Sequence, residues 1–414
     1  MEFRPLIKDP GVFDLAMQSL PVPGHLTPQQ IATAYNIPFN NGAGVKIGII
    51  SLGGGWKQTD LNKSMADLGL PPPTINQVLL NGATNNFNIN DRNHSLENTL
   101  DIFCISAMVP SANITIYITS VNTTADGQAW IDAFNRAIDD GMDIISHSWG
   151  TSEEYGDFLA PVLSKAKSNN VIVLSASGDY GSQDTSGNKG VVYPASNADI
   201  IAVGGTTLTL NPNGSRSTEL GNSDSGGGIS NIVPLPAWQT GLTYRIYNSQ
   251  TRVTGPETLL PRRGIPDVSA PYQYYAFYFD GNIRSGVVGT SASTPIIAGI
   301  IARFISLNGR KPDWILPQFY QNQGTSFTNI SVGNNASHIT EGYAVTPNWD
   351  PVTGLGAPIG QTLFDKLTSP PLGKVKNNTG AWTAIKGVWT KQSTGWTQVK
   401  DIWIKTTTGW QRPR

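Results

Sequence analysis

Five short apolar runs constrain the fold of this chain more than any other feature. Each run is rich in β-branched residues, hydrophobic without a break, and bounded by Gly, Asn or Asp, as is typical of strands buried on both faces. The runs are VKIGIIS (45–51), NITIYITS (113–120), MDIISHSW (142–149), NVIVLSAS (170–177) and IIAVGGT (200–206). Amphipathic helical patterns lie between them, as in residues 126–141 and 155–170. This alternation predicts an α/β fold whose parallel sheet is covered by helices on both faces.

Two further helices are predicted by the signals at their ends. The segment LTPQQIATAYN (26–36) offers Thr27 as a cap and Pro28 in the first turn. The segment GTSASTPIIAGIIARFISLNG (289–309) is long and apolar and ends at Gly309. In folds of this class catalytic residues tend to lie at the carboxyl ends of the strands, so candidates are expected there.

The composition excludes several classes of protein. A net charge of −1 without a Lys/Arg block argues against nucleic acid as the main partner. No run of about 18 apolar residues is present, so no membrane span is expected. Residues 1–21 hold acids and prolines where a signal peptide would have an unbroken apolar run. The single cysteine, Cys104, excludes an internal disulfide and is interpreted as a small buried hydrophobe.

The C-terminal residues contain an internal repeat. After a predicted linker at 369–380, residues 382–395 and 396–409 are identical at seven of 14 positions, and Trp recurs every seven residues from 382 to 410. The glycines and Thr-rich runs oppose a helix and favour short β-strands joined by turns. Such a unit is too small to bury its own face unless the repeats stack or a partner covers them.

Ser291 is the first candidate catalytic residue. It lies in Gly-Thr-Ser-Ala-Ser-Thr-Pro (289–295), where small residues precede the long apolar helix. Unpaired backbone N–H groups at a helix N-terminus favour a developing negative charge, and a serine nucleophile there needs a base. The alternative is a motif of small residues that lets two helices pack closely.

Glu97 and Asp101 are the candidate base. On a helix that starts near His94, they lie at i and i+4 on one face, and neither has a Lys or Arg three or four residues away. Two desolvated carboxylates that repel each other raise one pKa and share a proton. The alternative is a solvated acidic patch, which the apolar neighbours in LDIFCISAMV (100–109) disfavour.

Three more polar motifs follow strands or turns. Asp179 comes after a strand in the Gly-rich segment SASGDYG (175–181), where it serves either a site or the turn itself. Ser148, Trp149 and Gly150 end another strand. Asp350, in WDPVTG, suits either a turn or a hard cation. Of the four histidines only His94 lies near a candidate, and we expect it on the surface or rim rather than in a Ser-His-Asp triad.

Taken together, these motifs resemble the sedolisin (serine-carboxyl) peptidases, which share the subtilisin fold. The resemblance covers residues 25–368 and leaves an N-terminal extension at 1–24 and a Trp-rich β-repeat tail at 381–414. The matching segments, in family order, are LTPQQIATAYNIP, IGIISLGGGW, Glu97-x-x-x-Asp101, SHSWG, SASGDYGS, SGGGIS, VPLPAWQ, RRGIPDVSA, GTSASTP and WDPVTGLGAP.

The resemblance implies a role for each candidate. Ser291 looks like the nucleophile, Glu97 the general base and later acid, and Asp101 the group that orients and tunes Glu97. Asp179 looks like the oxyanion-hole acid, which acts with the backbone N–H of Ser291. Ser148, Trp149 and Gly150 look like the strand that pairs with the substrate backbone. A carboxylate base and a protonated carboxyl donor both imply activity in acid.

The resemblance also implies one calcium ion near the C-terminal end of the peptidase domain. The matching positions are Asn329, Ile330, Thr346, Asn348 and Asp350. The family usually has Asp where Asn329 stands, and this change removes a full charge from a hard-cation site. We therefore expect weakened calcium binding, or a water-filled pseudo-site.

Two other departures from the family are expected to matter. Members usually carry a long pro-domain, whereas only about 25 residues precede the first matching segment here. Either the pro-domain has been removed, or this member folds without a pro-domain. Ser51 stands where some relatives have a Glu that supports the catalytic carboxylates.

The predicted function is an acid-acting serine-carboxyl peptidase whose partners are peptides or unfolded proteins. The alternative is a non-catalytic virion or surface component that uses a peptidase-like scaffold for binding. The tail repeats resemble short repeats at the ends of phage virion and tail proteins, which suggests an assembly partner and a secreted or virion-associated location.

Overall fold

The computed structural model describes residues 3–8, 19–88, 92–120 and 127–368, together with six short strands of the C-terminal segment. The chain divides into two compact units, Met1–Phe364 and Asp365–Arg414. The first unit holds every predicted site residue.

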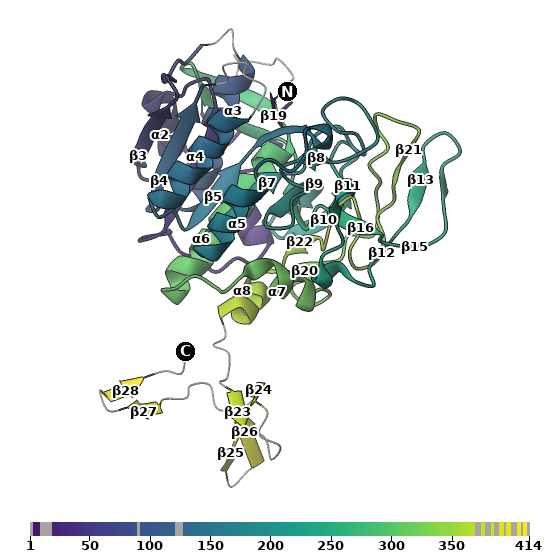
Figure 1. Cartoon of the computed structure of the whole chain (residues 1–414). Coiled ribbons are helices and arrows are strands. Elements are labelled where there is room, and N and C mark those ends of the chain that lie inside the picture. Colours follow the sequence, from purple (N-terminus) through teal and green to yellow (C-terminus); the bar gives the residue numbers. More distant parts are fainter. Residues whose placement is uncertain are drawn as a thin grey trace. The chain divides into compact units, whose positions relative to one another are not determined.

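An eight-stranded sheet forms the centre of the first unit (Figure 1). Its strand order is β10-β9-β7-β5-β2-β4-β3, and β17 also pairs with β9. Seven of these strands run parallel, whereas β10 pairs antiparallel with β9. The strands are β2 (Lys46–Leu52), β3 (Ile75–Leu80), β4 (Asn113–Thr119), β5 (Ile144–His147), β7 (Ile172–Ala176), β9 (Ile201–Leu210), β10 (Arg216–Gly221) and β17 (Val268–Pro271). The predicted parallel sheet is confirmed.

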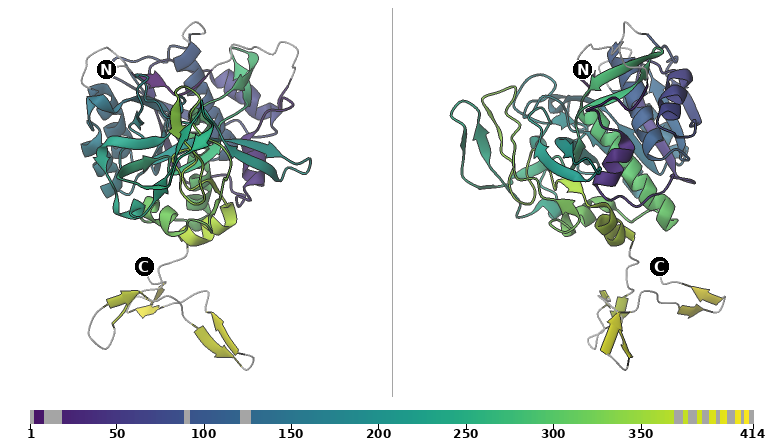
Figure 2. Two further views of the ribbon diagram at one scale, coloured as in Figure 1. Left: turned by 90° about the vertical axis from the view of Figure 1, so that its right-hand side faces the viewer. Right: turned by 180° about the vertical axis from the view of Figure 1, so that it is seen from behind.

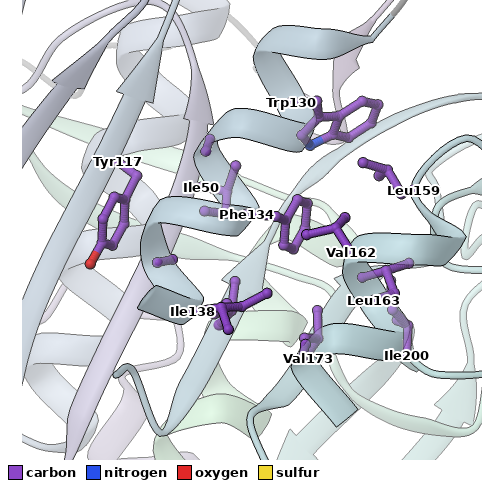
Figure 3. Close-up of a cluster of buried hydrophobic side chains, with 14 of the residues drawn as sticks. Ile50, Tyr117, Trp130, Phe134, Ile138, Leu159, Val162, Leu163, Val173 and Ile200 are labelled. Atoms are coloured by element: carbon purple, nitrogen blue, oxygen red, sulfur yellow. The ribbon is translucent and has the colours of Figure 1, made fainter. Parts of the chain in front are cut away.

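Helices cover both faces of this sheet. The helices are α1 (Pro28–Ala34), α2 (Gln58–Asp67), α3 (Arg92–Met108), α4 (Gln128–Asp139), α5 (Ala160–Ser168), α6 (Thr290–Asn308), α7 (Ile315–Gln321) and α8 (Gly360–Thr368). Helices α4 and α5 pack together, and their apolar side chains meet Ile50, Ile145 and Val173 of the strands in one buried cluster (Figure 3). Helices α3 and α6 pack against each other. Helix α6 also packs against β5, β7, β9 and β17, and α3 packs against β2 and β4.

The helix ends follow the sequence signals. Thr27 accepts a hydrogen bond from the backbone N–H of Gln30, whose side chain accepts one from the backbone of Thr27, so α1 starts with a complete capping box. Helix α6 ends at Gly309, whose φ of 69° is the left-handed conformation that favours glycine. Among the described residues, α6 alone is long and apolar enough to cross a membrane, and most of it is buried inside this unit.

Short strands and turns make up the rest of the first unit, as the two views in Figure 2 show. Strands β1 (Arg4–Pro5), β6 (Trp149–Ser152) and β8 (Val192–Tyr193) form a three-stranded sheet in the order β1-β6-β8. The other strands are β11 (Gly228–Pro234), β12 (Thr243–Tyr244), β13 (Ile246–Asn248), β14 (Val253–Thr254), β15 (Thr258–Leu259), β16 (Arg262–Ile265), β18 (Tyr275–Phe279), β19 (Asn282–Val287), β20 (Phe327–Thr328), β21 (Glu341–Tyr343) and β22 (Ala357–Pro358).

A buried ion pair fixes the turn between β16 and β17. Arg263 donates to both carboxylate oxygens of Asp267 at 2.6 Å, and both side chains are fully buried. Asp267 also accepts from the backbone N–H of Ala202 at 2.8 Å and from the hydroxyl of Tyr320 at 2.6 Å. Both carboxylate oxygens of Asp267 therefore have hydrogen-bond donors, as a buried charge requires. The motif RRGIPDVSA, which contains Arg263 and Asp267, thus stabilises the core of the fold.

The described residues of the second unit form three antiparallel strand pairs. They are β23 (Lys374–Lys376) with β24 (Trp382–Ala384), β25 (Trp389–Gln392) with β26 (Gly395–Gln398), and β27 (Ile404–Thr406) with β28 (Gly409–Gln411). The short strands predicted for the repeats are therefore present. The predicted linker at 369–380 is not wholly irregular, because β23 lies inside it.

Candidate active site

Five candidate side chains come from four separate parts of the chain. Helix α3 carries Glu97 and Asp101, helix α6 carries Ser291 in its first turn, Asp179 follows β7, and Ser148 lies between β5 and β6. Each of these five residues is buried, with at most 1% of its surface exposed. The alternative of a solvated acidic patch, which the apolar neighbours of Glu97 and Asp101 disfavoured, is therefore excluded.

A glycine lets the two catalytic helices approach. A Cβ atom placed on Gly299 of α6 would lie 2.4 Å from Cγ of Met108 on α3. Arg303, one turn further along α6, donates from Nε to the carbonyl of Met108 at 3.0 Å, which satisfies an end carbonyl of α3. The packing that brings Ser291 to Glu97 thus depends on a residue without a side chain.

The hydroxyl of Ser291 hydrogen-bonds Glu97. Its Oγ donates to Oε2 of Glu97 at 3.0 Å, across 194 residues of sequence. The other carboxyl oxygen of Glu97, Oε1, has no hydrogen-bond partner among the described residues. A serine that donates to a buried carboxylate is the arrangement of a nucleophile with its base.

Burial raises the pKa of both carboxyl groups on α3. For Glu97 burial is the largest cause and the charge of Asp101 the second, while the Ser291 hydrogen bond acts in the lowering direction. Burial likewise raises the pKa of Asp101, opposed by the Ser148 hydroxyl, which donates to its Oδ1 at 2.9 Å. The pair therefore retains a proton in conditions where exposed carboxyl groups have lost theirs.

Asp179 lies against the start of α6. Its Oδ1 accepts from the backbone N–H and the Oγ1 of Thr290, both at 2.9 Å, while its Oδ2 has no partner within the described segments. Burial raises the pKa of Asp179 to about 7, although the two Thr290 hydrogen bonds and Lys8 lower it. In acid this carboxyl group is protonated and can donate from Oδ2.

The strand that carries Ser148, Trp149 and Gly150 is paired with the N-terminal segment of the same chain. The register places Arg4 opposite Gly150 and Pro5 opposite Trp149 in antiparallel pairing. The next residue, Leu6, donates its backbone N–H to the carbonyl of Ser148 at 2.9 Å. Sequence reasoning missed this segment, since FRPLIK carries no local signal for a site.

No histidine takes the place of Glu97 beside the nucleophile. The Ser291 hydroxyl donates to Glu97, and its oxygen also lies in contact with the carbonyl oxygen of Leu6. His94 is partly buried and stacks on the indole of Trp149, with ring centroids 5.0 Å apart, at the rim where we expected it. His147 is fully buried beside aromatic rings, and burial lowers its pKa to about 3, so it stays neutral.

Ser51 supports the first turns of α3 without adding a charge. Its hydroxyl donates to the side-chain oxygen of Asn98 and lies 3.0 Å from the carbonyl of Gly53, to which the Asn98 amide also donates at 3.0 Å. The uncharged pair of Ser51 and Asn98 therefore lies next to Glu97, at the position where some relatives have a Glu.

The predicted calcium ligands do not form a strong cation site. Asp350 is fully buried, and its carboxylate accepts from the backbone of Val352 and Thr353 at 2.8 Å, from the Thr353 hydroxyl at 3.0 Å and from the backbone of Thr346 at 3.4 Å. Burial raises its pKa to about 7. Both oxygens are thus committed to a turn, which fits the turn interpretation of Asp350.

The remaining members of the predicted calcium set add no charge. Asn329 and Asn348 are exposed, whereas the side chain of Ile330 is buried. Across residues 3–8, 19–88, 92–120 and 127–368, no group of three or more His, Cys, Asp or Glu side chains could hold a metal ion. The donor set does not fit a tight calcium site.

The raised pKa of Asp179 predicts a stability that falls as pH rises. Because the native state binds this proton more tightly than the unfolded chain, the contribution of Asp179 is complete below about pH 4 and is lost by about pH 7. The expected slope is about 1.4 kcal/mol of unfolding free energy per pH unit. In urea denaturation series, Asp179→Asn should lower the slope of the parent by that amount, and Ser291→Ala in both the parent and the variant keeps the site inert.

Asp139→Asn is the matched control, because the Asp139 side chain is 62% exposed. It should leave the pH dependence of the parent unchanged. Equal slopes for Asp179→Asn and the parent between pH 4 and 7 would contradict the assignment. The comparison also separates the effect of Asp179 from that of His147. Because the pKa of His147 is lowered, its contribution to the unfolding free energy decreases as pH falls, opposite to that of Asp179.

The amino-acid sequence is similar to those of known peptidases. The sequence profile of the subtilase family, peptidase S8, matches residues 42–318. Kumamolisin from Bacillus sp. (strain MN-32) is 33% identical over 392 aligned residues, which cover 88% of this chain and 67% of that protein. Tripeptidyl-peptidase 1 from Homo sapiens is 32% identical over 226 residues, covering 50% of this chain and 39% of that protein.

A solved structure shares the fold. The Pseudomonas sedolisin, a serine-carboxyl proteinase complexed with two molecules of pseudo-iodotyrostatin, superposes with a TM-score of 0.68. The match covers 84% of this chain and 98% of that one, at 24% sequence identity. The predicted subtilisin-like fold is confirmed.

Proposed function

Because this chain belongs to the subtilase family, as a serine peptidase of the sedolisin type, we propose that Ser291, Glu97, Asp101 and Asp179 carry its hydrolysis of peptide bonds in acid. The observation that supports this assignment is the 3.0 Å hydrogen bond from Ser291 to Glu97, next to a second buried carboxyl group. The proposed substrates are peptides and unfolded proteins.

In the first half-reaction Ser291 attacks the carbonyl carbon of the scissile bond. Glu97, as a carboxylate, accepts the hydroxyl proton along the existing hydrogen bond. Asp101 holds the shared proton of the pair, and Ser148 fixes the orientation of Asp101. Glu97 then gives its proton to the leaving amine, and the acyl group remains as an ester on Ser291.

Asp179 and the backbone N–H of Ser291 stabilise the negative charge that develops on the carbonyl oxygen. The unpartnered Oδ2 of Asp179 donates only when the carboxyl group is protonated, which its pKa of about 7 ensures in acid. In the second half-reaction Glu97 activates a water molecule, which hydrolyses the ester and restores Ser291.

The pH dependence of the rate follows from these two roles. We expect kcat/KM on a denatured protein to be highest between about pH 3 and 5, where one proton is shared by Glu97 and Asp101. It should fall as pH rises through about 7, because Asp179 ionises. A rate maximum above pH 7 would refute the carboxylate mechanism.

Replacing the nucleophile or the base should have similar effects. At pH 4, Ser291→Ala and Glu97→Gln should each lower kcat/KM by about 10³-fold or more, because residues that act as a unit are not additive. Ser293→Ala is the matched control on the same helix, since its hydroxyl bonds the carbonyl groups of Ala270 and Pro271 at 3.0 and 3.1 Å. It should keep most of the activity.

Equal, negligible cleavage by the parent and Ser291→Ala would favour the alternative of a non-catalytic scaffold. Loss of activity in Ser293→Ala to the same extent would point to disruption of α6 rather than to removal of the nucleophile. Circular dichroism of each variant at pH 4 separates a folded, inactive chain from an unfolded one.

Calcium binding by this member is proposed to be weak. Asp350 supplies the carboxylate of the predicted set, and its pKa of about 7 leaves it protonated at acid pH. Titration calorimetry at pH 4 and pH 7 should show no sub-micromolar calcium site, and a chelator should leave the unfolding temperature unchanged. A sub-micromolar site that Asp350→Asn abolishes would overturn this expectation.

The repeat unit is proposed to attach the peptidase to a larger assembly, with a secreted or virion-associated location. The support is the sequence repeat and the series of short strand pairs, because an isolated two-stranded hairpin is at best marginally stable. Deleting residues 369–414 should leave activity on denatured protein at pH 4 unchanged within about twofold. A larger loss would place the tail in catalysis or folding instead.

A further inference from the structure

The repeat unit, residues 369–414, carries a charge opposite to that of the rest of the chain. It holds eight of the 28 Lys and Arg residues but one, Asp401, of the 29 Asp and Glu residues. Residues 1–368 therefore hold 20 basic and 28 acidic side chains. The net charge of −1 thus conceals a basic C-terminal segment, and such an asymmetry indicates a polyanionic partner.

We propose that the strand pairs β23–β24, β25–β26 and β27–β28 form a repeated binding site for an acidic polysaccharide, whose sugar rings pack on Trp and whose anionic groups pair with Lys. This inference rests on the proposed attachment role of the repeat unit and names the chemical class of its partner. It does not depend on the assignment of the catalytic residues.

The same two residue types face each other in the three described strand pairs of this unit, which are labelled in Figure 1. In each, the antiparallel register places a Lys opposite a Trp: Lys376 with Trp382, Lys391 with Trp396, and Lys405 with Trp410. Residues directly opposite each other in an antiparallel pair share one face of the hairpin, with Cβ atoms about 5 Å apart. Each pair therefore combines a cation and an indole on one face.

The pair β25–β26 shows the composition of this face most fully. Because alternate residues of a strand lie on the same face, Trp389 and Gln398 share the face of Lys391 and Trp396. The other face of this pair carries two Thr residues, a Gln and a Gly. Two indoles, an ammonium group and an amide group thus belong to one face, and the other face has neither charge nor ring.

These side-chain types suit a sugar ring that bears an anionic group. An indole has a large apolar surface for the C–H groups of a sugar and one N–H for a hydroxyl group. An amide both donates and accepts, as neighbouring sugar hydroxyl groups require. The ammonium of Lys offers three donors to a sulfate, phosphate or carboxylate group. Because three such faces are linked in one chain, a polymer that reaches two of them binds with avidity.

The choice of Lys over Arg favours a polysaccharide rather than a nucleic acid. Arg is the residue that nucleic-acid recognition uses most, through bidentate and stacked contacts. The six described strands of the repeat unit contain four Lys residues and no Arg. A nucleic acid is therefore the competing ligand that the test has to exclude.

The attraction persists in the acid conditions in which the peptidase is proposed to act. Lys side chains are protonated at pH 4, and sulfate esters and phosphodiesters remain ionised there. Attraction to an acidic protein weakens near that pH instead, because carboxyl groups gain protons. An anionic polysaccharide can thus retain the peptidase where peptide bonds are to be cut.

The test titrates the full chain with dextran sulfate and with neutral dextran at pH 4, and Ser291→Ala prevents proteolysis. Calorimetry should show binding of dextran sulfate and none of neutral dextran. The affinity should fall at least about tenfold between about 50 and 300 mM salt, because binding to a polyanion releases counterions. Absence of dextran sulfate binding would overturn the inference.

Charge removal tests the Lys positions. The first variant combines Lys376→Gln, Lys391→Gln and Lys405→Gln. It should bind dextran sulfate at least about tenfold more weakly, whereas Arg at the same three positions should retain most of the affinity. If the Arg variant bound as weakly as the Gln variant, charge at these positions would not be the cause, and the proposed pairing would be wrong.

The matched control removes the same charge from the first unit. It combines Lys165→Gln, Lys167→Gln and Lys189→Gln, at side chains that are 38%, 38% and 40% exposed. This variant should bind dextran sulfate within about twofold of the parent. Equal weakening in the control would mean that net charge alone drives binding, which would overturn a site on the repeat unit.

Two further ligands test the class of partner. Polyphosphate, a polyanion without rings, should bind at least about tenfold more weakly than dextran sulfate at equal charge concentration. Equal binding would overturn the role of Trp. A single-stranded oligodeoxythymidylate of about 20 nucleotides should also bind more weakly than dextran sulfate. Tighter binding of this oligonucleotide would identify a nucleic acid as the partner and overturn the inference.

The outcomes are distinct from those that decide the proposed function. Cleavage of denatured protein at pH 4 by the chain that retains Ser291, without dextran sulfate binding by the inactive chain, would overturn this inference and leave the peptidase assignment standing. Self-association that deletion of residues 369–414 abolishes, without polysaccharide binding, would keep the attachment role. It would identify a second copy of the chain as the partner and would also overturn the inference.

Discussion

The close packing of α3 against α6 is the constraint on which the active site depends. It brings Glu97 and Ser291, 194 residues apart in sequence, into one hydrogen bond. It also buries the carboxyl groups of Glu97 and Asp101, and that burial is the largest cause of their raised pKa values. Geometry and acid–base chemistry therefore have one origin, because the contact that aligns the proposed nucleophile also removes water from its proposed base.

Much of the fold could be predicted because its strands are buried on both faces. The unbroken β-branched runs at β2, β4, β5, β7 and β9 are the direct consequence of that burial. Strand β3 was missed because it is half exposed at the sheet edge, where INQVLL shows no such run. The motif GTSASTP had two interpretations. Ser291 hydrogen-bonds Glu97, which supports a site, whereas the closest contact between α6 and α3 lies at Gly299, outside the motif.

The parts of the site that depend on a particular side chain could be predicted from the sequence. The parts that involve only backbone atoms could not. Glu97, Asp101, Asp179 and Ser291 were found as titratable or nucleophilic groups in unusual settings. The contact of Leu6 with Ser291 joins residues 285 apart through a main-chain carbonyl, which leaves no mark on the sequence. For Asp350 the residue type left two interpretations, a turn and a cation ligand, and only its hydrogen bonds reveal that it closes a local turn.

The covalent connection of Phe3–Lys8 to the rest of the domain has a kinetic consequence. Only residues 9–18 separate this segment from the next described residue, and short tethers give effective concentrations on the order of millimolar. A free peptide of equal intrinsic affinity must exceed that concentration to occupy the groove, so every outside substrate competes with a strand of the same chain.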